Sequence, residues 1–202
     1  MFDRSGLMSR VVPPAAQDVP AYCRDEPFDC STYRLLGGGF FSKPDHIETI
    51  EASSRYGILT RTNETFAHDG DGLKIGGLTY RHLPPLPKGT RLSGSWLYTY
   101  AAAGSMAMSS GGIAIQRGLS LGSDGHFSRT GWSGVSTTNE SGGTTTGFTS
   151  SHKAPAQSGR YEIDGYHIIL TGDDGTAETM VLFEPDGSDK LLTINGDNYL
   201  KQ

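Results

Sequence analysis

Acidic residues gather at three turns of the chain, and their carboxylates are the side chains best suited to bind a hard cation. The three pairs are Asp69 and Asp71, Asp173 and Asp174, and Asp186 and Asp189. Each pair lies beside glycine, which is typical of a hairpin turn. No segment has the glycine and the distant glutamate that complete an EF-hand loop. We therefore expect solvated turns here, with no metal ion and no cofactor.

The histidines and serines show no catalytic spacing. The chain has six histidines: His46, His68, His82, His126, His152 and His167. None forms an H-x-H or H-E-x-x-H pattern, and the pair His68 and His82, which flanks one expected hairpin, lacks a third ligand. The sequence also has no G-x-S-x-G nucleophile elbow. Paired catalytic carboxylates leave no local signature, so an enzyme that uses acids or histidines inside a β-barrel lumen is kept as an alternative.

The composition favours a β protein and excludes several classes of partner. The 202 residues are 35% apolar and 19% charged and include 28 glycines, a combination typical of short strands joined by many turns. The formal net charge is −5 and no cluster of lysine and arginine occurs, so we expect no nucleic-acid partner. No run of eighteen apolar residues occurs either, and we expect no membrane insertion.

A short pattern, L-x-I-x-G-x-x-Y, occurs twice at identical spacing. The first copy runs from Leu73 to Tyr80 and the second from Leu192 to Tyr199. Internal similarity of this kind reports architecture before it reports chemistry. We expect two related all-β units, in which the two tyrosines, and the two isoleucines of the pattern, occupy equivalent positions.

The chain divides into four segments. Residues 1–31 are rich in proline and show little periodicity, which predicts an irregular arm. Residues 32–83 form a partial β repeat unit, residues 84–91 a proline-rich linker, and residues 92–202 a complete antiparallel β meander. The linker is assigned because three prolines in four positions cannot join the interior of a sheet.

Two segments of the second unit are predicted as loops because large apolar residues are scarce in them. Ala101–Gly112 consists mainly of small residues. Gly134–Ser158 is rich in serine, threonine and glycine, and Val135 and Phe148 are its large apolar residues. Loops of this length are commonly lids or partner-binding arms. Phe148 would then anchor the segment over an opening. The alternative is a tolerated insertion with no such role.

The cysteines, Cys23 and Cys30, lie seven positions apart in a turn-rich stretch. Their spacing permits a disulfide without requiring one, and two reduced thiols are the alternative. A disulfide would indicate an oxidising, extracytoplasmic compartment. Without it, the sequence leaves the localisation open.

The strand that opens the second unit carries Gly94-Ser95-Trp96, a Gly-x-Trp motif, and Asp-Gly turns separate the strands that follow. With these features, residues 92–202 resemble lipocalin-like (calycin-type) antiparallel β-barrels. A similar Gly-x-Trp opens avidin-type barrels. The closing pattern, from Gly159 to Tyr199, is similar to bacterial lipocalin-like domains of unassigned function. The Thr-Asp-Tyr segment and the closing arginine of true lipocalins are not found, so no ligand-binding residue is carried over.

The resemblance implies a barrel or sandwich with an interior that Trp96 helps to close. Gly94 would allow close approach of the backbone where the strand enters the barrel, and the indole N–H would bond a nearby carbonyl. The aromatic residues expected at a ligand site are Trp96, Tyr98, Phe127, Tyr161, Phe183 and Phe148.

We therefore expect a non-catalytic binding module, secreted or periplasmic, for a small apolar molecule or a protein partner. The alternatives are the lumen enzyme named above and a purely structural or interaction domain whose core is filled. The state of the interior discriminates them, because a filled lumen, an apolar cavity and a cavity with buried carboxylates each indicate a different class.

Overall fold

The structure, a computed structural model, describes residues 1–14, 17–38, 43, 45–52, 57–106, 109–141 and 144–202. They form two compact units, Met1–Pro84 and Pro85–Gln202, which we describe one at a time. Both units consist mainly of antiparallel strands, which confirms the predicted all-β class. No helix among the described residues is long and apolar enough to cross a membrane.

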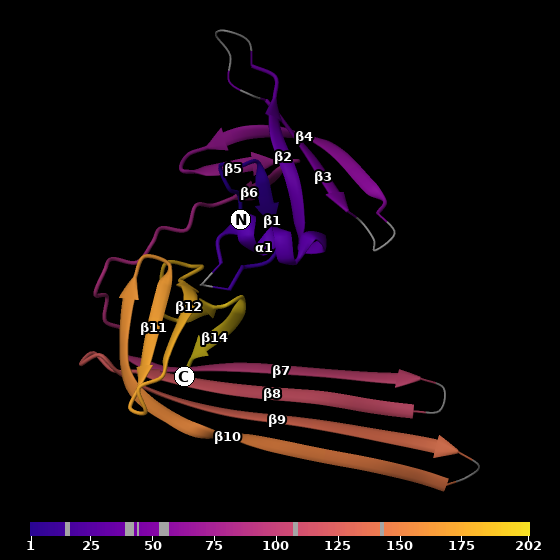
Figure 1. The fold of residues 1–202 in the computed structure, drawn as a ribbon, viewed down its shortest axis with the longest axis vertical. Coiled ribbons are helices and arrows are strands. Elements are labelled where there is room, and N and C mark those ends of the chain that lie inside the picture. Colours follow the sequence, from indigo (N-terminus) through magenta and orange to yellow (C-terminus); the bar gives the residue numbers. More distant parts are fainter. Residues whose placement is uncertain (15–16, 39–42, 44, 53–56, 107–108, 142–143) are drawn as a thin grey trace. The chain divides into compact units, whose positions relative to one another are not determined.

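The first unit is a six-stranded sheet in which each strand pairs with the next in the sequence (Figure 1). Its strands are β1 (Leu7–Ser9), β2 (Cys30–Leu36), β3 (His46–Ala52), β4 (Leu59–Asp69), β5 (Gly72–Ile75) and β6 (Leu78–Tyr80). The sheet curls into a half-barrel around a small core of Ile47, Phe66 and Ile75. Beside this core, the buried carboxylate of Glu48 pairs with Arg34 and Arg61.

The segment predicted as an irregular arm, residues 1–31, is folded, and that prediction is corrected. It contains β1, the helix α1 (Val19–Asp25) and the 3-10 turn η1 (Pro27–Asp29). The Asp18 carboxylate accepts a hydrogen bond from the Ala21 N–H at 2.7 Å and caps the helix. Proline in the first helical turn costs no hydrogen bond. The prolines that suggested irregularity are therefore compatible with a helix.

A disulfide joins Cys23 of α1 to Cys30 of β2, which resolves the open alternative in favour of the bridge. Val19 and Tyr22 pack with the two cysteines in a second small core. The Tyr22 hydroxyl donates a 2.7 Å hydrogen bond to Asp29, and this bond, followed by burial, raises the pKa of Tyr22 to about 12.

The second unit is a closed antiparallel barrel of eight strands. Its strands are β7 (Gly94–Met106), β8 (Ser109–Leu121), β9 (His126–Ser141), β10 (Thr144–Asp164), β11 (His167–Gly172), β12 (Ala177–Phe183), β13 (Leu191–Ile194) and β14 (Asp197–Lys201). Neighbours in sequence are neighbours in the barrel, and β14 closes the ring by pairing with β7. The predicted meander is thus confirmed, whereas membership of the lipocalin family is not shown.

The Gly-x-Trp motif lies at the strand pairing that closes the barrel. Lys201 of β14 pairs with Trp96 of β7. Gly94 has a φ of 153°, a backbone conformation that side-chain-bearing residues rarely adopt, and a Cβ atom there would lie 2.6 Å from the flexible end of the Lys201 side chain. The Trp96 side chain is buried, and its indole N–H donates a 2.6 Å hydrogen bond to the carbonyl of Asp189. The Lys201 ammonium lies 5.2 Å from the centre of the Trp96 ring.

The proline-rich segment that precedes the barrel is part of the second unit. Leu86 forms a β-bridge with Gly165 at the turn between β10 and β11. The Gly89 N–H donates a 2.8 Å hydrogen bond to the carbonyl of Ile163. The compact units divide between Pro84 and Pro85, so most of the expected linker lies against barrel strands.

The repeated pattern corresponds to two equivalent hairpins. Leu73 pairs with Tyr80, and Leu192 pairs with Tyr199. Both turns have two consecutive residues at positive φ, as a type I′ turn requires. The isoleucine before each turn is buried, but Tyr80 is 48% exposed and Tyr199 is 8% exposed. The two copies therefore have the same strand register, but the tyrosine is buried only in the copy that belongs to the closed barrel.

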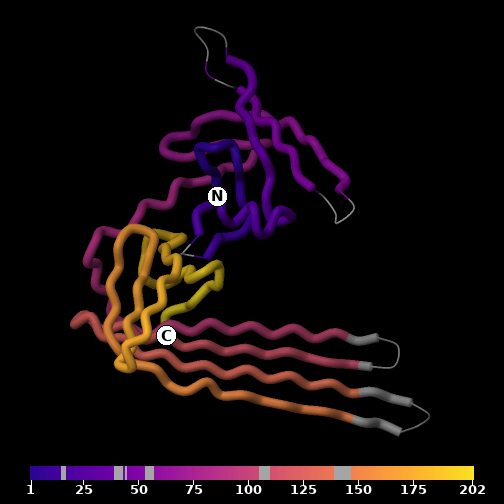
Figure 2. The backbone as a smooth tube through the Cα atoms, viewed as in Figure 1, coloured from indigo at the N-terminus to yellow at the C-terminus, as the bar shows by residue number. Residues whose placement is uncertain are grey.

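Both predicted loops of the second unit are strands, and those predictions are corrected. Ala101–Gly112 belongs to β7 and β8, and Gly134–Ser158 to β9 and β10, with residues 107–108 and 142–143 outside the described part. The four strands run well beyond the ends of the others, as Figure 2 shows along the backbone. Strand pairing uses backbone groups, and threonine is a good strand former, so a shortage of large apolar residues did not prevent it. We call the part of β7–β10 beyond the barrel the extension.

Replacing Trp96 with Phe should lower the free energy of unfolding of the second unit by about 2–4 kcal/mol, since it removes buried volume and leaves the Asp189 carbonyl without its donor. Urea unfolding followed by circular dichroism measures the change. The matched control is Trp132→Phe at a 41% exposed site, with an expected change of about 0.5 kcal/mol or less. Equal effects of the two substitutions would contradict the role of Trp96 in closure.

Replacing Asp29 with Asn should return the pKa of Tyr22 from about 12 toward 10. The neutral phenol is the hydrogen-bonded form, so this contribution to stability is full below pH 10 and is lost as the pH rises through 12. Ultraviolet difference titration detects the tyrosine that ionises late. The control, Asp25→Asn in the same helix, should leave that step in place. A late step that survives Asp29→Asn would refute the assignment.

Candidate functional site

The barrel lumen is filled by side chains over most of its length. Fourteen buried residues form one cluster: Leu92, Trp96, Leu119, Leu121, Phe127, Tyr161, Ile163, Ile168, Leu170, Met180, Leu182, Leu192, Ile194 and Tyr199. The Tyr161 hydroxyl accepts from the Leu92 N–H at 3.0 Å and donates to the Gly122 carbonyl at 2.9 Å. A polar group in the cluster is thus satisfied by backbone, and this part of the barrel is a packed core.

The aromatic residues predicted for a ligand site separate into three groups. Trp96, Phe127 and Tyr161 lie in the packed core. Tyr98 is half-buried against the core, and its ring centre lies 5.6 Å from that of Tyr199. Their contact with a ligand stays a prediction.

Two predictions are corrected: Phe183 does not lie in the barrel interior, and Phe148 does not anchor a loop over an opening. Phe183 follows the core residue Leu182, and because side chains alternate along a strand it points to the outside of the barrel. Phe148 is 61% exposed on the extension. The segment that contains Phe148 is paired strand, so it is not a loop that closes over an opening.

A cavity of about 470 Å³ lies at the end of the barrel from which the extension leaves, and we call it the mouth. Its floor is the end of the packed core, and its wall is formed by β8–β12 and the hairpin of β13 and β14. The apolar lining residues are Leu119, Leu170, Met180, Ile194 and Tyr199. This volume is within the range of small-molecule sites, which occur commonly in barrel mouths.

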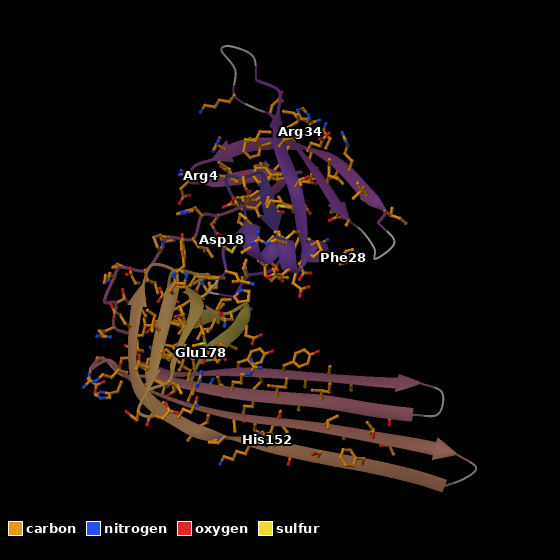
Figure 3. All side chains as sticks on the ribbon, in the orientation of Figure 1. Arg4, Asp18, Phe28, Arg34, His152 and Glu178 are labelled. Carbon is orange, nitrogen blue, oxygen red and sulfur yellow. A yellow bond between two sulfur atoms is a disulfide. The ribbon has the colours of Figure 1, made fainter. Side chains whose placement is uncertain are left out.

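Two arginines lie at the rim of the mouth, and each pairs with a carboxylate on another strand. Arg117 of β8 bonds Asp197 of β14 at 2.7 Å. Arg129 of β9 bonds Glu178 of β12, whose side chain is labelled in Figure 3. The charged side chains of the lining are these two pairs, so their formal charges cancel.

The tyrosines near the rim have raised pKa values. Burial raises the pKa of Tyr199, while the Arg117 guanidinium acts in the opposite direction. Burial also raises the pKa of Tyr98, and the charge of Asp197 adds to it. The Arg117 guanidinium lies 5.5 Å from the centre of the Tyr98 ring. Both phenols are therefore neutral hydrogen-bonding groups at neutral pH.

A β-bulge forms one side of the mouth. Ala154 and Gln157 of β10 pair with Gly131 and Arg129 of β9, so two residues of β10 lie opposite one residue of β9. A bulge bends its strand, and β10 turns from the extension into the barrel wall (Figure 2). Pro155 lies in this bulge, where proline is tolerated because a hydrogen bond of the strand ladder is already missing.

The extension is a four-stranded sheet with two distinct faces. Residues in register with the lumen-facing side chains form one face, which we call the lumen-side face: Tyr100, Ala102, Gly104, Gly111, Ile113, Ile115, Ser133, Val135, Thr137, Phe148, Ser150 and His152. Trp132 and Ser151 lie on the opposite face. The Trp132 ring covers Gly134, where a Cβ atom would lie 2.8 Å from it.

Sequence analysis missed the residues of the mouth. Arg117 lies two positions from the core residue Leu119, and Arg129 two positions from Phe127. Residues two apart on a strand share a face. A charged residue that shares a strand face with core residues therefore indicates the open end of the lumen, and this is the signal in the sequence that could have identified the mouth.

Among the described residues, no three or more histidine, cysteine or acidic side chains are arranged to hold a metal ion. His68 and His82 belong to the first unit, and the acidic pairs lie at exposed turns. No family model matches the chain, and neither the curated proteins nor the solved structures include a match.

Replacing Arg117 with Met should raise the pKa of Tyr199 further, because it removes the cation that favours the phenolate. The pKa of Tyr98 should rise as well, since Asp197 then acts without its partner. Carbon-13 NMR of the tyrosine ring, recorded against pH, measures both. Arg160→Met, an exposed site on β10, is the control. An unchanged or lower pKa of Tyr199 in Arg117→Met would contradict this arrangement.

Proposed function

We propose that the protein is a non-catalytic binding module that holds a neutral small molecule with an apolar body in the mouth of the barrel. The observation that carries this proposal is the mouth itself, a cavity of about 470 Å³ with an apolar floor and a polar rim. Binding sites of this kind combine apolar walls with a few polar groups that orient the ligand.

The rim supports a neutral ligand. Arg117 and Arg129 are already bonded to Asp197 and Glu178. A charged ligand would therefore have to displace one member of a pair and leave the other unpaired, which is costly in a partly buried site. A neutral ligand could instead bond the phenol and amide groups of the rim while Met180 and Leu170 contact its apolar part.

The same pairs favour binding over catalysis. A general base must reach the substrate with a free carboxylate or imidazole. Both carboxylates of the mouth accept hydrogen bonds from arginine, and none of the described residues that line the cavity is a histidine. The disulfide between Cys23 and Cys30 supports a secreted or periplasmic place for this binding module.

The test uses N-phenyl-1-naphthylamine, a neutral apolar dye that fluoresces in apolar sites. The dye should bind the purified protein, and Ala154→Phe should weaken binding about tenfold or more, because Ala154 lines the mouth and a phenyl ring would fill it. The control, Lys153→Phe, adds the same ring to the opposite face of β10 and should leave dye affinity unchanged.

Two results would overturn the proposal. One is dye binding that Ala154→Phe does not weaken. The other is dye binding that depends on Phe148 of the extension, because the dye would then bind outside the mouth. Both variants are checked for an unchanged melting temperature, so that loss of binding reports on the cavity and not on unfolding.

A further inference from the structure

The extension is a sheet whose lumen-side face is covered by no other described element of the second unit. The second unit buries its other lumen-facing side chains inside the barrel. On the extension the same strands continue with Tyr100, Ile113, Val135 and Phe148, which are 47%, 49%, 38% and 61% exposed. A sheet normally buries one face against another layer. Exposed apolar surface gathered on one face indicates an interaction site.

We propose that the lumen-side face of the extension binds the same face of a second copy of this chain, so that two extensions stack as a two-layer β-sandwich. The proposal is independent of ligand binding in the mouth. It rests on the area, the charge and the relief of this face.

The area of the face is that of a weak, reversible dimer. The face begins at Tyr100, and β7 continues from there to Met106. At the usual rise and spacing of strands, four strands of this length cover about 23 Å by about 19 Å, or about 440 Å² per copy. A pair of copies would bury about 900 Å², which is in the range of weak and transient interfaces. We expect a reversible dimer of modest affinity.

The charge of the face favours a partner with the same face. Among its described residues, from Tyr100 to His152, the lumen-side face has no carboxylate, lysine or arginine. Two copies can therefore stack without opposing like charges and without burying an unpaired ion. Each chain has a formal net charge of −5, and salt screens the repulsion between whole molecules. Salt should therefore strengthen the dimer, whereas it would weaken a complex formed by ion pairs.

The relief of the face is self-complementary. Large and small residues lie on opposite sides of one register row: Phe148 is on β10, whereas Gly104 and Gly111 are on β7 and β8. Layers interdigitate when large residues meet small ones. Because both copies present the same pattern, a two-fold axis can bring the large residues of each copy to the small residues of the other.

Sedimentation velocity over a range of micromolar concentrations tests the proposal on the full chain. The wild-type protein should dimerise, and the double variant Ile113→Thr with Phe148→Ser should weaken dimerisation about tenfold or more. Threonine and serine keep the strands polar and paired. The control is Trp132→Thr, which removes a large exposed side chain from the opposite face and should leave dimerisation unchanged.

A second experiment measures directly whether the lumen-side face is covered in the dimer. The chain has no free cysteine, so a single introduced thiol reports alone. Ser150→Cys and Ser151→Cys place it on the lumen-side and the opposite face of β10. The thiol at 150 should react more slowly with a maleimide as protein concentration rises, and the thiol at 151 should not. A wild-type monomer at every concentration, a dimer that the double variant does not weaken, or equal protection of the two thiols would overturn the proposal.

Discussion

The short pairing between β14 and β7 is the contact on which the second unit depends. In the described residues, Leu200 and Lys201 pair with Leu97 and Trp96. Side chains reinforce this seam: the Trp96 indole bonds the Asp189 carbonyl, and the Lys201 ammonium bonds the Asp189 carboxylate. Where the seam exists, lumen-facing residues are buried; beyond it, the same strands form an open sheet. The mouth lies at this boundary, so the position of the seam determines both the cavity and the extension.

Features that depend on neighbouring residues were predicted from the sequence. Gly94 and Trp96 indicated the closing strand, where Gly94 adopts a positive φ and the Trp96 indole is buried. Asn195-Gly196 indicated a hairpin because both residues adopt positive φ. Features that depend on the sheet as a whole were missed. Gly134–Ser158 was predicted as a loop because a hydrophobic pattern reports burial. Most described side chains of this segment are exposed, and the backbone ladder with the neighbouring strands holds it in place.

The residues of the candidate site also divide into those that the sequence predicted and those that it did not. The sequence identified aromatic residues of the barrel, and Trp96, Phe127 and Tyr161 are indeed buried together. Whether a barrel is packed or hollow depends on how these volumes fit in three dimensions, which residue types do not reveal. The ion pair of Arg117 with Asp197 joins residues 80 positions apart. Such a pair follows from strand register around the whole ring, and no local pattern in the sequence encodes it.

The open sheet has a length that can change independently of the barrel. Side chains alternate with a period of two, so an insertion of two residues in each strand of a hairpin would lengthen both faces and keep their identity. An odd shift in one strand would instead exchange its two faces. The tips lie at the opposite end of β7–β10 from the seam at Trp96, so neither change would alter the core. Among relatives of this chain, the barrel half of these strands should therefore stay constant in length, while the tips differ in steps of two residues.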